Sequence, residues 1–200
     1  MFPHMSQGMI HFNSTRVIKK NSLDSFEVSI AEAEAREQAY ELFQFFKNNI
    51  EGFEQCELVM SAPQIGVRES RMIQGEYTLE AEDLLGCKKF SDSIARGTYG
   101  IDIHSPDGAG TVLKKIPEGE YYTIPYRALI PVNTTNMLVA GRCISSTHEA
   151  QSAYRIMPIC CCIGEAAGSA ISLASKDGVP VRKISVDKLQ QLIKSKGGLV

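Results

Sequence analysis

Apolar and polar positions along the chain follow helical spacing in some stretches and strict alternation in others. Across 29–52, apolar residues recur three or four positions apart, behind a Ser29–Glu32 capping box and ahead of Gly52, which predicts a long helix. Residues 99–104 alternate apolar and polar side chains, which predicts a half-buried strand with one polar face. The chain is therefore expected to combine helices and strands.

Weaker patterns place further elements around these two. Residues 9–18 are strand-like, and 79–85 have the spacing of a short helix. A second short helix is predicted near 92–96, and an amphipathic helix over 186–193. Two X-Pro steps favour extended backbone across 121–131, because the residue before a proline avoids helical angles.

The stretch 137–174 carries the most distinctive pattern. Leu138–Ala140 form a short apolar run closed by Gly141, which predicts a strand in a covered sheet. Pro158 suits the first residue of a helix, where its missing N–H costs nothing. A helix face of glycine and alanine lets a flat ligand come close, although close packing on a sheet needs the same residue types. The small residues are Gly164, Ala166, Ala167, Gly168, Ser169 and Ala170.

The connection between that strand and that helix holds a dense set of polar side chains. Ligands of open α/β sheets gather at the carboxyl ends of strands, where this connection begins. His148 is its candidate for proton exchange near neutral pH, with Glu149 as the predicted partner; an exposed or core-satisfied histidine is the alternative. The other polar members are Arg142, Ser145, Ser146, Thr147, Gln151 and Arg155.

Composition limits the class of protein. The chain has 200 residues, 44% of them apolar, which is enough for one large core or two modest ones. Its formal charge of -2 gives no basic footprint, so neither nucleic acid nor an anionic membrane is expected as a partner. No apolar run approaches roughly 18 residues, and the first residues lack the pattern of a signal peptide. A cytoplasmic location is the remaining expectation.

Six cysteines raise the question of a metal or redox site. Cys160, Cys161 and Cys162 are consecutive, and neighbouring helical residues point about 100° apart, so these thiols cannot converge on one ion. The sequence also has no C-x-x-C-x-x-C run of the ferredoxin type. We therefore expect no metal site, and cysteines that act as small apolar fillers.

The stretch 137–174 closely resembles the C-terminal flavin-binding segment of the FAD-dependent oxidoreductases that include heterodisulfide-reductase-A-like proteins. Other parts of the chain resemble the same family, in the order in which the family carries them. The resemblance therefore covers nearly the whole chain. These further blocks are 5–17, 63–79, 93–106 and 122–131.

One hallmark of that family does not occur in this sequence. Its members open with G-x-G-x-x-G between a strand and a helix, where glycines admit the pyrophosphate of FAD. Here the glycines of 108–110 follow Ser-Pro-Asp, which is typical of a turn, and those of 164–168 lie inside a predicted helix. The resemblance therefore implies the C-terminal part of a longer flavoprotein that lacks the N-terminal half.

This interpretation defines the expected fold and domains. The chain is expected to be α/β (mixed α+β), with a partial substrate-binding domain over 1–131. Residues 132–200 would then be the C-terminal strand and helix of an FAD-binding Rossmann-like domain. Without neighbouring strands the run at 138–140 would expose apolar surface, so we expect a homo-oligomer or a separate nucleotide-binding half to complete the protein.

The resemblance also implies a function. FAD is the expected cofactor, and the expected reaction is two-electron or hydride transfer between FAD and a small-molecule substrate. The alternative is a catalytically inactive fragment, or an interaction subunit that needs a separate nucleotide-binding chain. The residues implied as catalytic are His148, Arg71 and Arg155. Those implied as cofactor-binding are Gly141, Arg142, Cys143, Met157, Pro158, Ile159, Cys160, Gly164, Ala167 and Gly168.

Four further residues are candidates for binding the substrate: Arg68, His104, Tyr126 and Arg127. Each has a structural alternative. Arg68, with Arg71, would otherwise be part of a solvated charged edge. His104 would form a wet surface pair on a half-exposed strand. Tyr126 and Arg127 would belong to a proline-braced strand edge with a packed tyrosine.

Overall fold

The computed structural model describes residues 2–104 and 111–200, and for His104, Thr111 and Val112 the backbone alone. The turn predicted at 108–110 lies outside the described residues.

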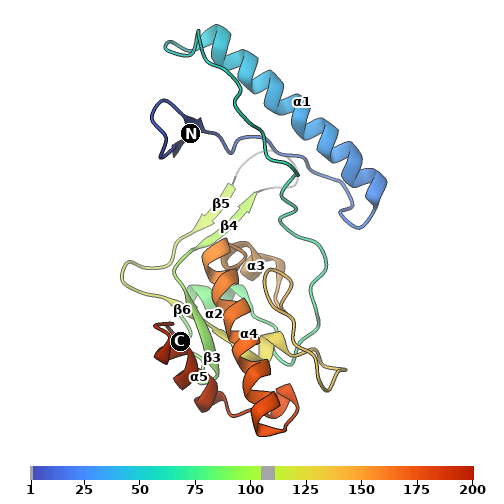
Figure 1. Cartoon of the computed structure of the whole chain (residues 1–200), viewed down its shortest axis with the longest axis vertical. Helices are drawn as coiled ribbons and strands as arrows, with labels where there is room; N and C mark the ends of the chain where they lie inside the picture. The colour runs from blue at the N-terminus through green and yellow to red at the C-terminus, as the bar shows by residue number, and fades with distance from the viewer. Residues whose placement is uncertain (1, 105–110) are drawn as a thin grey trace. The chain divides into compact units, whose positions relative to one another are not determined.

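The chain divides into two compact units, which we call unit 1, Met1–Val67, and unit 2, Arg68–Val200. Figure 1 labels the elements of both. The domain boundary predicted between residues 131 and 132 falls inside unit 2 and stays a prediction. Helices and small antiparallel sheets together agree with the expected mixed α/β class.

Unit 1 is built around one long helix, α1, which spans Ser25–Asn49 and is blue in Figure 1. The carboxylate of Asp24 caps its start and accepts a hydrogen bond from the backbone N–H of Phe26 at 2.8 Å. The helix therefore begins before the predicted Ser29, and it ends before the predicted Gly52. The cap explains the early start, because it satisfies N–H groups that a first helical turn leaves unpaired.

Short contacts tie the rest of unit 1 to α1. The backbone N–H of Ile65 donates to the carboxylate of Glu32 at 2.8 Å, and Arg36 donates to the carbonyl of Pro63 at 3.0 Å. Near the N-terminus, β1 (Phe2–Pro3) pairs antiparallel with β2 (Ile10–His11). This pair confirms strand structure for only a small part of the predicted 9–18.

Unit 1 buries very little apolar surface. On α1 only Ala31 is buried. The rings of Phe12, Phe46 and Phe53 cluster, with centroids 4.6 Å apart for the first pair. Most of the exposed large apolar side chains of the described chain belong to this unit. The described chain thus exposes apolar surface mainly on unit 1, and not at 138–140, where the sequence predicted it. On α1 it consists of Phe26, Ile30, Tyr40 and Phe45.

A two-stranded antiparallel sheet lies at the centre of unit 2, where β3 (Ser93–Gly97) pairs with β6 (Tyr122–Pro125). The helix predicted near 92–96 is wrong. The short SIARG run has no strong preference of its own, and pairing with the buried strand β6 decides for a strand. The extended backbone of β6 is followed directly by a short 3₁₀ helix at Tyr126–Leu129.

Three helices cover this sheet. α4 (Met157–Asp177) and α5 (Val186–Ser195) pack against β3, and α2 (Ala81–Leu85) packs against β6 (Figure 1). α4 carries Pro158 in its first turn, as its second residue and not as the predicted first. It ends at Gly178, which has a φ of 63° that suits glycine in a left-handed C-cap.

The second sheet of unit 2 pairs β4 (Ile101–His104) antiparallel with β5 (Thr111–Lys114). It confirms the strand predicted from the alternation across 99–104. α3 (His148–Tyr154) packs against β4. This helix occupies much of the connection that was expected to be a polar loop, and Thr147 caps its start.

The core of unit 2 joins these elements. From α4, Ile163, Ala166 and Ala170 point inward, toward β3 and α5. The largest fully buried side chains include Leu79, Leu84, Ile94, Tyr122, Ile124, Leu129, Ile144, Tyr154, Ile163 and Leu189.

The strand predicted at Leu138–Ala140 is not formed. These residues carry no strand assignment, and Val139 N–H donates to the carbonyl of Leu129 at 2.9 Å. The apolar run is half-buried beside the turn at Leu129 instead of inside a sheet. A three-residue apolar run cannot by itself establish which neighbour it pairs with.

One helix in the described part of the chain, α4, is long and apolar enough to span a membrane by length and composition alone. This corrects the expectation that no stretch comes near that length. A core helix of a soluble protein passes the same test, and Ile163 and Ala166 of α4 are buried inside unit 2.

Candidate functional site

The segment that starts unit 2 runs beside the segment that precedes α3. Ile73 N–H donates to the carbonyl of Cys143 at 3.1 Å, and Leu79 N–H donates to that of Ser145 at 3.1 Å. Leu79 in turn accepts from the N–H of Thr147 at 2.9 Å. This parallel pairing brings the start of unit 2 against the first turn of α3.

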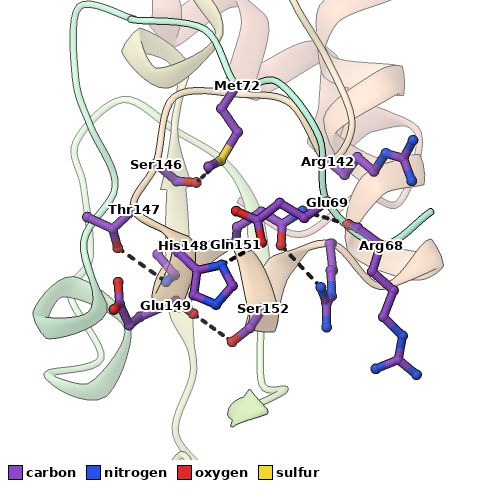
Figure 2. Close-up of polar contacts among 12 residues, drawn as sticks. Arg68, Glu69, Met72, Arg142, Ser146, Thr147, His148, Glu149, Gln151 and Ser152 are labelled. Atoms are coloured by element: carbon purple, nitrogen blue, oxygen red, sulfur yellow. Dashed lines mark hydrogen bonds and ion pairs between the residues drawn. The ribbon is translucent and has the colours of Figure 1, made fainter. Parts of the chain in front are cut away.

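His148 is the first residue of α3, and its imidazole meets a carboxylate from the facing segment. Nδ1 of His148 lies 2.5 Å from Oε2 of Glu69, as the dashed line in Figure 2 shows. The His148 side chain is 53% exposed and that of Glu69 is 29% exposed. The pair therefore lies at the surface, with the carboxylate more sheltered than the ring.

Gln151, one turn after His148 on α3, contacts two arginines. Its side chain is almost fully buried, and its amide NH₂ donates to the backbone carbonyl of Arg68 at 2.9 Å. Its amide oxygen accepts from Nη1 of Arg155 at 3.4 Å. Of the sequence candidates, Arg155 contacts Gln151 through its side chain and Arg68 contacts it only through its backbone carbonyl, on the helix that begins with His148.

Charges of both signs act on the guanidinium of Arg155. Partial burial lowers the pKa of the Arg155 guanidinium, and the positive charge of Arg68 adds to that effect. Glu69 and Asp102 oppose it. The pKa of Tyr99 is raised by burial and by Asp102, to whose carboxylate its hydroxyl donates at 3.2 Å. The cluster thus has paired charges of both signs.

The buried ring of Tyr154 links α3 to the turn before it. Its hydroxyl lies 2.9 Å from Oγ of Ser146, and it is 3.3 Å from the carbonyl oxygens of both Arg142 and Ile144. Ser146 also donates to the sulfur of Met72 at 3.2 Å (Figure 2). Burial raises the pKa of the Tyr154 hydroxyl, which keeps it neutral.

The same tyrosine connects to the start of α4. The thiol of Cys160 lies 3.7 Å from the carbonyl of Tyr154. Burial raises the pKa of Cys160, its neighbours Cys161 and Cys143 add to the rise, and Arg142 opposes it. The predicted cofactor residues Arg142 and Cys143 therefore lie near the first turn of α4.

The N-terminus of α4 has no side-chain cap. Cys160 N–H donates to the carbonyl of Ile156 at 3.0 Å, so the N–H groups of Met157 and Ile159 are the unpaired ones that every helix start presents. Met157 is 81% exposed. The start of this helix is therefore accessible from solvent.

The predicted small residues of α4 divide between two faces. Nothing lies within 4 Å of the position that a side chain would occupy at Gly164 or Gly168, so this face is open. Ala167 is buried and belongs to the core face. Gly141 has a φ of 87°, a left-handed conformation that favours glycine, with open space around it.

Other sequence candidates lie apart from this cluster. Tyr126 is buried and its hydroxyl donates to the carbonyl of Val181 at 2.9 Å. Arg127 forms a two-point ion pair with Asp92, at 2.9 and 3.1 Å. Both arrangements match the packing alternative. Substrate roles for these residues stay predictions, as does the catalytic role of the exposed Arg71; the side chain of His104 lies outside the described residues.

Metal chemistry finds no support in the described residues. They contain no group of three His, Cys, Asp or Glu side chains that could hold an ion, and all six cysteines are free thiols. A shallow hollow of about 280 Å³ lies beside Asn136, Ile171 and Val181 and shares no residue with the His148 cluster.

Comparison with known proteins identifies the family. A family model described as FAD dependent oxidoreductase matches residues 2–193. The chain belongs to the FAD-dependent oxidoreductase family. FAD is accordingly its cofactor, and oxidation–reduction is its general chemistry. No curated protein and no solved structure gives a significant match to the chain.

Within this FAD-dependent oxidoreductase, three residues of the cluster were not singled out from the sequence. Glu69, and not the predicted Glu149, is the partner of His148. Gln151 was noted only as a polar member of the connection, and Tyr154 was not noted. Glu69 is 79 positions from His148 in the chain, so no local spacing links them. The one sequence signal for Glu69 was its position between Arg68 and Arg71.

Proposed function

We propose that this chain transfers two electrons, as a hydride, between a small-molecule substrate and FAD. We place the flavin beside Gly141–Cys143 and the first turn of α4. The observation that carries the proposal is the position of Tyr154, whose hydroxyl contacts the carbonyl of Arg142 and whose own carbonyl contacts Cys160. His148 is the first residue of the same helix α3 and lies about 10 Å from Tyr154 along the helix axis.

The residues present fit a flavin at this place. The start of α4 has no side-chain cap, and a helix N-terminus favours an electron-rich group. Gly141 leaves open space, and Gly164 and Gly168 form an open face on α4. These features suit a flat, negatively polarised ring system and the approach of another backbone.

Each group of residues then has one task. FAD, when bound, supplies the two-electron chemistry. The N–H groups of Met157 and Ile159 stabilise negative charge at the start of α4, and Arg142 offsets charge on the cofactor. His148 exchanges a proton with the substrate, and Arg68 and Arg155 orient it through their fixed donor geometry.

We also infer the setting of the protein. A dinucleotide-binding half, from another segment or a second copy, would pack on the open face of α4 and complete a Rossmann-like FAD domain. Within the family, we assign the chain to the heterodisulfide-reductase-A-like group. Six free thiols agree with a reducing compartment, which supports a cytoplasmic location.

A flavin titration of the full chain tests this proposal. FAD should bind saturably, and Gly168→Leu should weaken binding by at least tenfold, because its side chain would fill the open face of α4 on which the dinucleotide-binding half of the site would pack. The matched control is Cys162→Leu, an exposed position about 120° around the same helix, which should bind as the unmodified chain does. Absence of saturable binding at tens of micromolar FAD would favour the interaction-subunit alternative instead.

A further inference from the structure

We infer that Glu69 is a positioning residue for His148: its carboxylate engages Nδ1 of the imidazole and leaves Nε2 as the nitrogen that meets the substrate. The inference deepens the proposed function and rests on it. It concerns a residue that touches neither substrate nor cofactor and acts through the histidine.

The geometry of the pair carries the inference. Nδ1 of His148 and Oε2 of Glu69 are in hydrogen-bond contact, 2.5 Å apart. Figure 2 shows the imidazole with its Nδ1 turned toward Glu69. Since one ring nitrogen is engaged and the side chain is about half exposed, the other nitrogen is the one left for a ligand.

The backbone around Glu69 is held in place. The carbonyl of Arg68 accepts from the buried amide of Gln151 at 2.9 Å, and Ile73 N–H donates to Cys143 at 3.1 Å. Gln151 lies on α3 one turn after His148, so the same helix anchors both partners. The backbone that carries the carboxylate is therefore anchored to the same helix that carries the imidazole.

The hydrogen bond determines which nitrogen carries the proton. In the neutral ring, Nδ1–H donates to the carboxylate of Glu69, and Nε2 keeps its lone pair. A substrate hydroxyl or amine can then give its proton to Nε2, which leaves the substrate one proton poorer and His148 as an imidazolium. Glu69 stabilises that positive charge where it forms.

Glu149 is the natural alternative, because it follows His148 directly in the first turn of α3. Its side chain is exposed, and its backbone carbonyl accepts from Ser152 at 2.7 Å. Adjacent helical residues point in different directions. Glu149 is thus a matched control: a carboxylate of the same type, next to His148 in sequence, without the contact to Nδ1.

Nitrogen-15 NMR of the imidazole rings tests the inference on the full chain, without FAD or substrate. The signals of His148 are assigned by their loss in His148→Gln. The unmodified chain should carry the neutral proton on Nδ1. Glu69→Ala should shift the ratio of the two neutral forms by about fivefold or more toward Nε2–H, as loss of one hydrogen bond predicts.

The control variants decide between a specific and a general effect. Glu149→Ala should leave the ratio as in the unmodified chain. Glu69→Gln, which keeps an acceptor oxygen but loses the charge, should fall between the two and serves if Glu69→Ala does not fold. An unchanged ratio in both Glu69 variants, or an equal shift in Glu149→Ala, would overturn the inference.

The NMR result separates this inference from the proposed function. The ratio could shift in Glu69→Ala although the unmodified chain binds no FAD. The hydrogen bond would then stand, but the catalytic role that it serves would be lost with the proposed function, and the inference would be overturned for that reason. Saturable FAD binding with an unchanged ratio would keep the proposed function and overturn Glu69 alone. A shifted ratio together with saturable FAD binding supports both.

Discussion

Unit 1 and unit 2 use similar fractions of helix to very different effect. Unit 1 consists largely of α1 and extended chain, and α1 buries only Ala31. Unit 2 packs helices on both of its small sheets around a continuous set of buried side chains. A helix by itself does not make a core, because most of its stability in a protein comes from what its apolar face packs against.

The difference decides where a functional site can be precise. The His148–Glu69 pair is supported by buried groups, Gln151 and Tyr154, that have hydrogen-bond partners inside unit 2. The exposed apolar residues of α1, such as Phe26 at 81%, have no comparable support. We therefore expect unit 2 to determine the stability of the chain.

The largest expected effect compares the same substitution in the two units. Ile163→Ala, at a fully buried position of α4, should lower the free energy of unfolding by about 2–5 kcal/mol, because it removes buried methyl groups and leaves a cavity. Ile30→Ala, at a position of α1 that is 55% exposed, should change it by less than about 0.5 kcal/mol.

Urea unfolding followed by circular dichroism measures both values. If Ile30→Ala lowered the free energy of unfolding as much as Ile163→Ala does, the contrast between the two units would be wrong. Such a result would mean that α1 buries this face in solution, for example against a second copy, and an Ile30→Ala loss that grows with protein concentration would identify that case.

Ion pairs give a second, smaller contrast. Asp92 is 9% exposed and accepts three hydrogen bonds from Arg127, through the backbone N–H and two guanidinium nitrogens. Asp92→Asn should cost about 1–3 kcal/mol, since it weakens charge-assisted bonds at a buried site. Glu34→Gln, which breaks the 3.7 Å surface pair of α1 with Lys20, should cost no more than about 0.5 kcal/mol.

Salt distinguishes these two pairs further. Raising the ionic strength should leave the Asp92→Asn loss largely in place, because a sheltered pair is screened little. Equal losses for Asp92→Asn and Glu34→Gln would contradict the view that only unit 2 shelters its charges.

The smallest expected effect separates two buried tyrosines within unit 2. Tyr154→Phe should cost about 1 kcal/mol at pH 7, because its hydroxyl has partners. Tyr122→Phe should cost nothing, or stabilise by about 1 kcal/mol, because the Tyr122 hydroxyl is buried with no partner in the described part of the chain.

The pH dependence of the same variants follows from the direction of the pKa shifts. Burial raises the pKa of Tyr154 and of Tyr122 in the folded state, above the unfolded value of about 10. Keeping these hydroxyls neutral costs the folded state nothing below pH 10. Above pH 10 the free energy of unfolding falls, because the tyrosines ionise first in the unfolded chain. Each variant should therefore show a shallower alkaline loss in urea unfolding at pH 9–11.

Much of unit 2 was predictable where the sequence pattern is local. Pro158 lies in the first turn of α4, and the alternation across 99–104 located β4. The misses are cases where a distant partner decides. The run at Ser93–Gly97 becomes a strand because β6 pairs with it, and the run at Leu138–Ala140 stays outside a sheet because the neighbouring segments pair elsewhere.

The site shows the same limit. His148, Arg155 and the start of α4 were identified because they crowd into one stretch of sequence. Glu69 was missed because its contact with His148 depends on the parallel pairing of Leu79 with Ser146. Proximity along the chain instead favoured Glu149, whose side chain stays exposed to solvent.

The joint between α3 and α4 has a practical consequence. α3 ends at Tyr154 and α4 begins at Met157, so Arg155 and Ile156 are the whole connection. A joint this short has little slack, so we expect a ligand that tilts the first turn of α4 to turn α3 as well and to displace the imidazole at its far end. The ring signals of His148 would then report occupancy at α4, in a chain that has no tryptophan to act as a fluorescent probe.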